Sequence, residues 1–254
     1  MRVPKNYLPL DVLTAARERI AWTFNNFEKV YVSFSAGKDS TVMLHLVADE
    51  ARQRGTTFGV LLVDLEGQYR VTIEHAELCL DDCADITDQY WVALPLALRN
   101  AVSVYEPKWQ CWEPGKEDIW VRPLPKRAIN DEAYFPFFQR DMEFEEFVPE
   151  FGEWYAQGKK TACLVGIRAD ESLNRFRTIA SRHKETVDGM QWTSVITENV
   201  ANVYPIYDWK TEDIWTYHGK HPDRPYNKLY DLMGMAGLKP SQMRICQPYG
   251  DDQR

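Results

Sequence analysis

Apolar and polar positions along the first hundred residues alternate between helical spacing and strand spacing. Segments whose apolar residues recur every three or four positions are expected to be helices, and Asp11 is placed to cap the first of them. Short β-branched or continuously apolar runs are expected to be buried parallel strands. The expected helices cover residues 11–28, 41–51 and 69–83, and the expected strands cover residues 28–35, 58–64 and 91–96. This β-α-β-α-β series predicts an α/β fold with an open, mostly parallel sheet and helices on both faces.

The pattern changes between residues 105 and 136, where prolines interrupt the chain and tryptophans cluster, so regular structure is not expected there. Beyond this insertion, helices are expected at 137–157, within 168–181, at 211–218 and near 231, and strands at 162–167 and 203–206. We expect one domain over residues 1–254, with the insertion at 105–136 and a C-terminal extension at 236–254.

Composition narrows the class of protein. With 44% hydrophobic residues the chain can bury a full core, and no run approaches the roughly 20 apolar residues that cross a bilayer. Five scattered cysteines suit a reducing compartment, and the first residues lack the apolar core of a signal peptide, so we expect a cytoplasmic protein. The net charge of -8 means that duplex nucleic acid would have to bind a local basic patch.

A candidate phosphate-binding loop follows the first expected strand. Its small residues let backbone N–H groups approach an anion, the next helix points its positive end at the same place, and lysine adds a cation. An ordinary strand-to-helix turn is the alternative, because glycine and serine also occur in turns for steric reasons. The candidate residues are Ser33, Ser35, Ala36, Gly37, Lys38, Asp39 and Ser40.

Two arginines follow a later buried strand. Arg168 and Arg175 come after Gly166, near the place where ligands lie in open α/β sheets, and arginine binds phosphate or sulfate bidentately. A salt-bridged surface is the alternative, because acidic residues lie between them.

Three segments, in order, carry a family resemblance. Residues 35–40, Ser-Ala-Gly-Lys-Asp-Ser, resemble the Ser-Gly-Gly-Lys-Asp-Ser signature of the PP-loop ATP pyrophosphatase superfamily. Residues 205–215 and 225–230 look like the "P-L-x-D-W-T-x-x-D-V-W" and "P-Y-N-P-L-Y" segments of phosphoadenosine phosphosulfate (PAPS) reductases. The resemblance covers about residues 28–235 and implies an adenine nucleotide α-hydrolase-like, Rossmann-like fold.

The resemblance also implies roles for individual residues. The loop would hold the phosphates of ATP or PAPS with Mg²⁺, and Lys38 and Asp39 would take part in catalysis. Arg168 and Arg175 would pair with the terminal phosphate or sulfate, and Asp64 would lie near the ribose or adenine. Residues expected near the substrate are Ser172, Asp208, Trp209 and Tyr226.

The cysteines depart from the reductase pattern. The reductases carry a C-terminal Glu-Cys-Gly-(Ile/Leu)-His segment with the nucleophilic thiol, and Cys246 is the nearest candidate here, without that glutamate or histidine. Cys79, Cys83 and Cys111 could together hold an iron-sulfur cluster, but we favour core packing for them and do not expect a cluster. The histidines show no zinc-ligand spacing.

Residues 166–177, the tryptophan-rich insertion and the tail resemble a phage and mobile-element subfamily typified by the immunoglobulin-binding regulator A-type proteins. Members commonly pair with a ParB/sulfiredoxin-like partner, and their chains usually continue further. The insertion itself has two interpretations: its aromatic and basic residues could stack nucleic-acid bases, or, as we prefer, its tryptophans form a satellite core.

Three functions therefore remain. The first is an enzyme that transfers an adenylyl group from ATP with release of pyrophosphate. The second is a PAPS reductase. The third is a nucleotide-dependent regulatory protein that acts through a partner.

Overall fold

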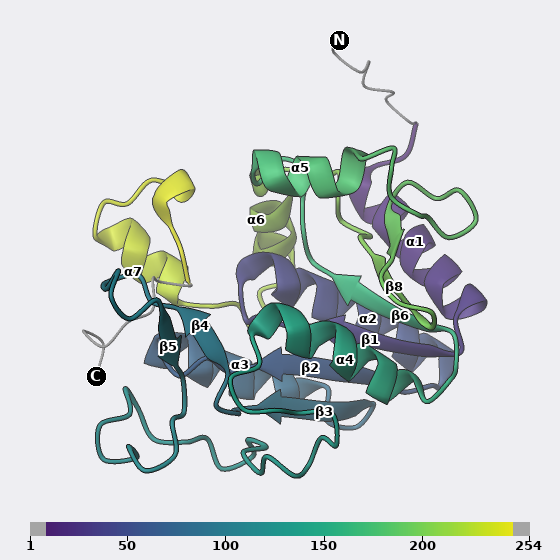
Figure 1. Cartoon of the computed structure of the whole chain (residues 1–254). Helices are drawn as coiled ribbons and strands as arrows, with labels where there is room; N and C mark the ends of the chain where they lie inside the picture. Colours follow the sequence, from purple (N-terminus) through teal and green to yellow (C-terminus); the bar gives the residue numbers. More distant parts are fainter. Residues whose placement is uncertain (1–8, 246–254) are drawn as a thin grey trace.

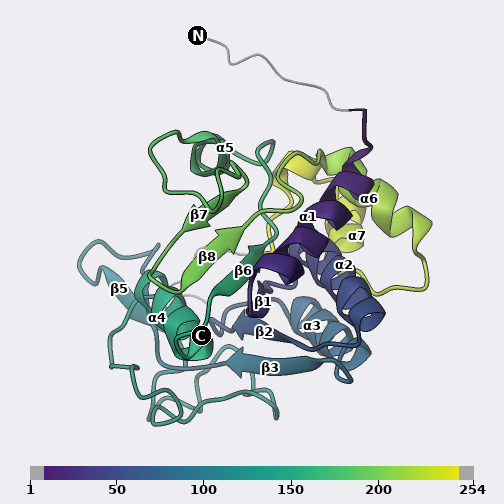
Figure 2. The same ribbon diagram turned by 90° about the vertical axis from the view of Figure 1, so that its right-hand side faces the viewer.

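The computed structural model describes residues 9–245. The strands of the central sheet are β1 (Lys29–Ser33), β2 (Phe58–Val63), β3 (Thr87–Val92), β6 (Thr161–Val165), β7 (Thr193–Val195) and β8 (Val200–Val203). Their order is β3-β2-β1-β6-β8-β7, and the strands from β3 to β8 are parallel to their neighbours (Figure 1). At one edge β7 runs antiparallel to β8 (Figure 2). The predicted open, mostly parallel α/β sheet is confirmed.

Helices cover both faces of this sheet (Figure 2). One face carries α1 (Val12–Asn26), α2 (Lys38–Arg54), α3 (Arg70–Asp82) and α6 (Thr211–Lys220), and the other carries α4 (Phe144–Ala156). The remaining helices are α5 (Leu173–Ala180), α7 (Leu229–Met235) and a 3-10 turn at Pro240–Gln242. Among residues 9–245, no helix has the length and apolar character needed to span a membrane.

Strand alternation divides the interior into two cores. Along β1, Val30 and Val32 pack with the helices α1, α2 and α3, whereas Tyr31 between them packs with Phe151 of α4. Successive side chains of a strand point to opposite faces, so a continuous apolar run serves both layers. The chain therefore needs almost no polar positions in its central strands.

Several predicted boundaries were wrong. β3 begins at Thr87, four residues before the predicted strand, because its first residues are polar and half-buried at the sheet edge. Apolar residues at 93–96 instead pack in the second core, the one on the α4 side of the sheet. The next strand, β4 (Ala97–Arg99), pairs with β5 (Lys108–Gln110), and β5 lies inside the region predicted to be irregular. Helix α4 starts at Phe144 rather than at 137, and the predicted strand at 203–206 is β8, three residues earlier.

Candidate functional site

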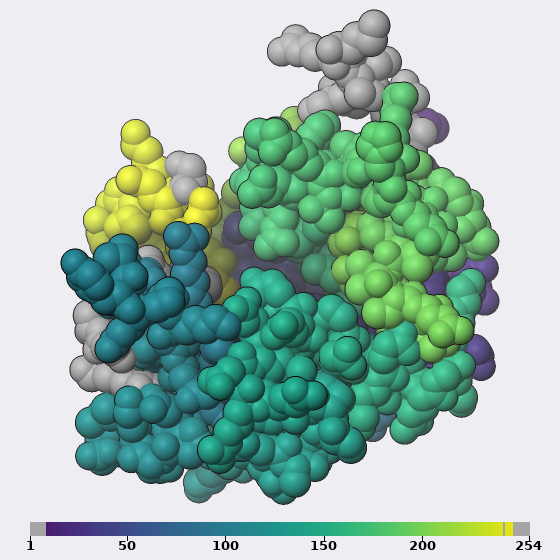
Figure 3. Space-filling model, in the orientation of Figure 1, coloured from purple at the N-terminus to yellow at the C-terminus, as the bar shows by residue number. Residues whose placement is uncertain are grey.

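The candidate site lies where the order of the strands reverses. Residues 34–37 leave β1 toward α2, and residues 166–172 leave the neighbouring strand β6 toward α5. Ligands of open α/β sheets bind at such a switch point, outside the carboxyl ends of the strands. The space-filling view shows this face hollowed between the teal middle of the chain, the green segment with α5 and the yellow C-terminal segment (Figure 3). Purple atoms from the early part of the chain form its floor.

The loop presents unpaired backbone donors at the start of α2. Gly37 is the N-cap, and the N–H groups of Gly37, Asp39 and Ser40 donate to no other described residue. The Ser40 hydroxyl donates to the Gly37 carbonyl at 3.1 Å and lies 3.1 Å from the Ser35 hydroxyl. Ser33 ends β1 just before the loop. Unpaired N–H groups at the positive end of a 17-residue helix form an anion-binding geometry.

Ala36 adopts a backbone conformation that favours glycine. Its φ angle is 58°, in the left-handed region, and its side chain is buried. The buried side chain of Asn227 donates to the Ala36 carbonyl at 3.0 Å and to the Thr72 hydroxyl at 3.0 Å. The sequence analysis quoted Asn227 only as part of the 225–230 segment and missed this support. That segment is therefore a structural clamp on the loop.

Two cations share one carboxylate beside the loop. Lys38 Nζ lies 2.9 Å from one oxygen of Asp39, and Arg168 Nε lies 2.5 Å from the other. The Arg168 side chain is only 2% exposed, so this guanidinium is held in place. With one negative and two positive charges, the three groups leave an excess positive charge that favours an anion.

Gly166 allows the two carboxyl-end segments to meet. A Cβ atom there would lie 3.0 Å from the backbone N and Cα of Ser40, a contact so tight that the Ser40 backbone would have to move by a few tenths of an ångström. The end of β6 can therefore touch the first turn of α2, which brings Arg168 to Asp39.

The C-terminal segment covers the loop from another side. The Lys38 N–H donates to the Tyr230 hydroxyl at 3.3 Å, and Lys38 Nζ lies 5.4 Å from the Tyr230 ring. Burial raises the pKa of Tyr230 to about 12, so the hydroxyl stays protonated. A Cβ atom at Gly37 would lie 3.0 Å from the side chain of Ile245, the last described residue. His218 of α6 lies 3.2 Å from the Lys38 carbonyl.

The carboxylate of Asp64, which the resemblance implies to lie near the ribose or adenine, is buried and hydrogen-bonded within the protein. Asp64 is 1% exposed, and its carboxylate accepts hydrogen bonds from Trp91, from the Glu66 N–H and from Arg122. Burial raises the pKa of Asp64 in spite of the nearby Arg122. All of these partners belong to the protein, so Asp64 holds the end of β2 together.

The insertion is anchored on this same strand end. Glu66 is fully buried, and its carboxylate accepts the N–H groups of Trp112 at 2.6 Å and Val121 at 2.9 Å. The Trp112 indole donates to the Asp64 carbonyl at 2.8 Å. Sequence reasoning missed Glu66, although its position two residues after the predicted strand was a signal.

The tryptophans of the insertion form a packed core. Trp109 and Trp112 are nearly fully buried in the second core, and the ring of Trp120 lies 5.1 Å from that of Trp112. Most of the basic residues that the nucleic-acid interpretation required are paired with acids of the chain. The pairs are Lys108–Glu143, Lys116–Glu113, Arg122–Asp64 and Arg127–Asp81. The packing interpretation is confirmed.

The other predicted site residues lie outside the loop. Arg175 is half exposed on α5, 3.8 Å from Glu171, and Ser172 caps that helix. Asp208 pairs with Arg19 of α1 at 2.7 Å. Trp209 is buried and donates to the Val12 carbonyl, and Tyr226 donates to Asp231. Asp208 and Trp209 thus fasten α1 to the chain after β8.

The four described cysteines are buried. Burial raises the pKa of Cys83 to about 11 and that of Cys163 to about 12, and raises those of Cys79 and Cys111 further. Cys79 and Cys83 lie in the core on the α3 side of the sheet and Cys111 in the other core, so these thiols do not converge on one cluster. Among residues 9–245, no three His, Cys, Asp or Glu side chains gather as a metal site. Cys246 lies outside the described residues.

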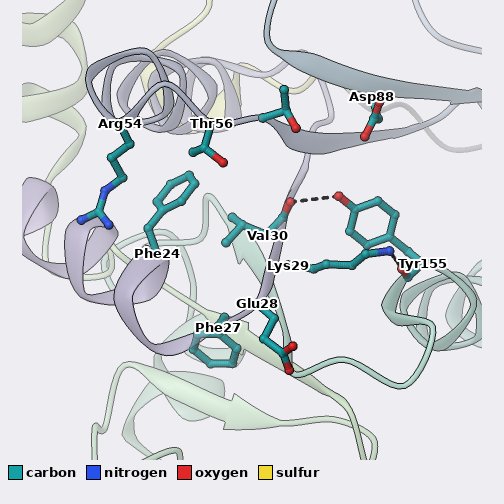
Figure 4. Close-up of a pocket in the computed structure, with 10 residues that line it drawn as sticks. Phe24, Phe27, Glu28, Lys29, Val30, Arg54, Thr56, Asp88 and Tyr155 are labelled. Atoms are coloured by element: carbon teal, nitrogen blue, oxygen red, sulfur yellow. Dashed lines mark hydrogen bonds between the residues drawn. The ribbon is translucent and has the colours of Figure 1, made fainter.

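Two surface hollows lie away from the loop. One, of about 590 Å³, is at the amino ends of β1, β2 and β3, and Figure 4 shows Lys29, Asp88 and Tyr155 around it. Lys29 there already donates to the Tyr155 carbonyl at 2.6 Å. The other, of about 650 Å³, lies beside residues 124–127. Neither contains a loop residue, so the chemistry of the switch point, and not the size of a hollow, defines the candidate site.

The fold and the loop define an α/β nucleotide-binding class of protein. Comparison with known protein families shows which family of this class the chain belongs to. The phosphoadenosine phosphosulfate reductase domain family matches residues 29–233. The chain belongs to this family.

A relative and two solved structures illustrate the range of similar proteins. The uncharacterized protein YbdN of Escherichia coli (strain K12) is 48% identical over the whole chain, which spans 63% of that relative's length. The PAPS reductase of Candida auris, a phosphate complex, is 15% identical with a TM-score of 0.48, covering 92% of this chain and 96% of the other. The FMN adenylyltransferase of Candida glabrata, with FAD and pyrophosphate, is 13% identical with a TM-score of 0.46, covering 86% and 58%.

Proposed function

We propose that this chain binds ATP at residues 35–40 and transfers its adenylyl group to an oxygen atom of an acceptor, with release of pyrophosphate. The observation that carries the proposal is the convergence of unpaired N–H groups, Lys38 and Arg168 at the switch point. Such a site is suited to a ligand with several adjacent negative charges.

The chemistry is a displacement at phosphorus. The acceptor oxygen forms a bond to the α-phosphorus while the bond to the oxygen bridging to the β-phosphate breaks, and the acceptor proton passes to water. Lys38 and the N–H groups of the first turn of α2 stabilise the charge that develops on the departing pyrophosphate. In the absence of a ligand, Asp39 holds the side chains of Lys38 and Arg168 in position. When ATP binds, its phosphate oxygens compete with the Asp39 carboxylate for these two cations.

Asp39 also suits a magnesium-nucleotide ligand. Mg²⁺ is typically held by one or two carboxylates together with substrate phosphates, and Asp39 places one carboxylate at the loop. Bound magnesium would neutralise part of the phosphate charge.

Calorimetric titration with ATP and Mg²⁺ tests the proposal. We expect Lys38→Ala to weaken ATP binding at least about tenfold, because a charge-assisted contact contributes about 1.5–3 kcal/mol. Lys160→Ala, at an exposed lysine beyond the amino end of β6, is the matched control and is expected to bind as the wild type does. Equal ATP affinity in the Lys38 variant would refute the assigned site, and tight binding without pyrophosphate release in the presence of candidate acceptors would refute the reaction.

One observation favours PAPS reduction as a second candidate. Ile245, which directly precedes Cys246, lies against Gly37 of the loop. In that reaction a thiolate attacks the sulfur, adenosine 3',5'-bisphosphate leaves, and a second thiol from reduced thioredoxin releases sulfite as a disulfide forms. The buried cysteines with raised pKa leave Cys246 as the candidate nucleophile.

Sulfite release from PAPS and reduced thioredoxin separates the two candidates. Turnover that is lost in Cys246→Ser and kept in Cys83→Ser supports the reductase. PAPS binding without sulfite, together with pyrophosphate release from ATP, supports adenylyl transfer.

A further inference from the structure

A basic segment follows β6 at the edge of the candidate site. Residues 172–184 contain Arg175, Arg177, Arg182, His183 and Lys184 and no acidic residue, in a chain whose net charge is -8. Acidic residues resume at Glu185. The local charge of this basic segment is therefore opposite to that of the whole protein.

Helix α5 in this segment contributes little to the core. Of its residues only Ile179 is buried, whereas α2 buries ten residues and α4 buries five. Leu173 is 63% exposed and Phe176 is 45% exposed. Large apolar side chains exposed together with two arginines and no acidic residue on one short helix point to a binding role rather than a packing role.

The cations of the segment have few internal partners. Arg177 and Arg182 form no salt bridge with any described residue, and Arg175 has one weak contact, to Glu171 at 3.8 Å. Only Lys184 is turned inward, where it donates to the Gln191 carbonyl at 2.6 Å. In the insertion, by contrast, most basic side chains pair with acids of the chain. The arginines of the basic segment remain available for an external anion.

The basic segment lies directly beside the loop. The six residues before it include Gly166, whose backbone packs on Ser40, and Arg168, which pairs with Asp39. The green segment with α5 forms one wall of the hollow whose floor is the early part of the chain (Figure 3). A ligand on α5 would thus lie at the mouth of the candidate nucleotide site.

We propose that the basic segment binds single-stranded nucleic acid. Phe176 shares an exposed face of α5 with Leu173, three residues before it, so its ring can stack a base while the arginines of the segment contact phosphates of the same strand. A single strand suits the site better than a duplex, because the net charge of -8 confines the favourable potential to this short segment. The proposal is independent of which nucleotide reaction the loop performs.

Fluorescence anisotropy with labelled 20-nucleotide DNA and RNA strands, and with the matching duplex, tests the proposal. We expect Arg177→Ala/Arg182→Ala to lower strand affinity at least about tenfold and to reduce the salt slope by about 1.4, since each phosphate contact to a single strand contributes about 0.7. Phe176→Ala is expected to lower affinity by about tenfold with the salt slope unchanged, because it removes stacking and not charge.

The matched control, Lys159→Ala/Lys160→Ala, removes two adjacent exposed lysines just before β6, whereas the basic segment lies after β6. Its affinity for the nucleic-acid strand is expected to remain within about twofold of that of the wild type. Circular dichroism melting checks that each variant is folded. Lys38→Ala should lose affinity for ATP and keep its affinity for the nucleic-acid strand, so the two binding measurements test the two proposed sites separately.

Three results would overturn the proposal. The first is that the wild type binds no single-stranded nucleic acid at low salt. The second is that the control and the Arg177/Arg182 variant lose equal affinity for it. The third is that inorganic polyphosphate binds as tightly as the nucleic acid and Phe176→Ala has no effect. The last result would identify a general anion surface.

Discussion

The carboxyl ends of β1 and β2 lie side by side in the sheet, yet they are built in opposite ways. After β1, the loop has backbone N–H groups that donate to no residue of the described range 9–245, and its charged side chains are partly exposed. After β2, Asp64 and Glu66 are buried, and the insertion supplies most of the donors that their carboxylates accept. The first end is an open site, and the second is a closed anchor.

This difference shows that position in an α/β sheet does not by itself assign a ligand role. Both strand ends lie at the edge where ligands bind in this class of fold, and both carry an acidic residue. In both places the carboxylate has partners within the protein, and what separates them is burial: Asp64 and Glu66 are at most 1% exposed, whereas Asp39 is 14% exposed beside backbone N–H groups that donate to no described residue. Variants at the two strand ends should therefore differ in which property they change, stability at the closed end and ligand affinity at the open end.

Glu66→Ala should cause the largest loss at the closed end. It leaves the N–H groups of Trp112 and Val121 without their buried charged acceptor, and we expect the free energy of unfolding to fall by about 4 kcal/mol. Urea denaturation measures this change. Glu74→Ala, in an exposed pair with Arg70, is the control and should change it by less than about 0.5 kcal/mol. A small effect of Glu66→Ala would mean that the insertion is not anchored there.

Acid should weaken the support behind the open end. His75 lies 2.9 Å from the Thr41 hydroxyl of α2, and burial lowers the pKa of His75 to about 4. The unfolded chain takes up this proton at about pH 6.5, so the contribution of His75 to stability is present above pH 6.5 and is lost by about pH 4. The expected loss is about 3 kcal/mol, because one pKa unit corresponds to about 1.4 kcal/mol.

Comparison of His75→Gln with the wild type isolates this effect from that of His45, whose pKa burial lowers to about 3. The variant should have a flatter dependence of unfolding free energy on pH than the wild type has. The closed end should respond in the opposite direction, because the raised pKa of Asp64 favours the protonated folded state as the pH falls. Identical pH profiles for the wild type and His75→Gln would contradict this assignment.

Gly166→Ala should damage the open end specifically. The added Cβ atom meets the backbone of Ser40 at 3.0 Å, so the first turn of α2 must shift, at a cost of about 2 kcal/mol. ATP affinity should fall together with thermal stability. Gly219→Ala in α6, where a Cβ atom meets nothing within 4 Å, should be neutral or slightly stabilising. Full ATP affinity in Gly166→Ala would show that this contact does not position the loop.

Ala36→Gly should have the smallest effect, with the opposite sign. Glycine relieves the left-handed strain at a φ of 58°, and we expect stabilisation of about 1 kcal/mol, measured as a higher melting temperature. Ala169→Gly, at a residue with an ordinary φ, is the control and should not stabilise the protein. A lower melting temperature for Ala36→Gly would mean that the packing of the Ala36 methyl group outweighs the strain.

Much of the fold was predictable because its signals are local. Asp11 accepts hydrogen bonds from Leu13 and Thr14 and caps α1 as predicted, and the loop lies between β1 and α2 as its small residues indicated. The hairpin β4–β5 was missed because each strand has three residues, too few for a period to be visible, and its pairing is set by the second core.

The candidate site was predictable only in part. The position of the loop between β1 and α2 rests on residues whose chemistry is readable from the sequence. Arg168 was expected to bind a phosphate or sulfate, and its pairing with Asp39 of the loop was not predicted. The burial of Asp64, the clamp by Asn227 and the anchor at Glu66 depend on residues from 27 to 191 positions apart along the chain. No local pattern encodes such contacts.

Hydrophobic period, small residues and motif spacing act over short stretches of chain, so the sequence was enough to predict the parallel α/β order, the position of the loop and the family. Which polar residues at the strand ends stay open and which are closed follows only from the folded arrangement. Hydrogen bonding in a buried site depends on every donor that packing brings near, and those donors come from distant segments.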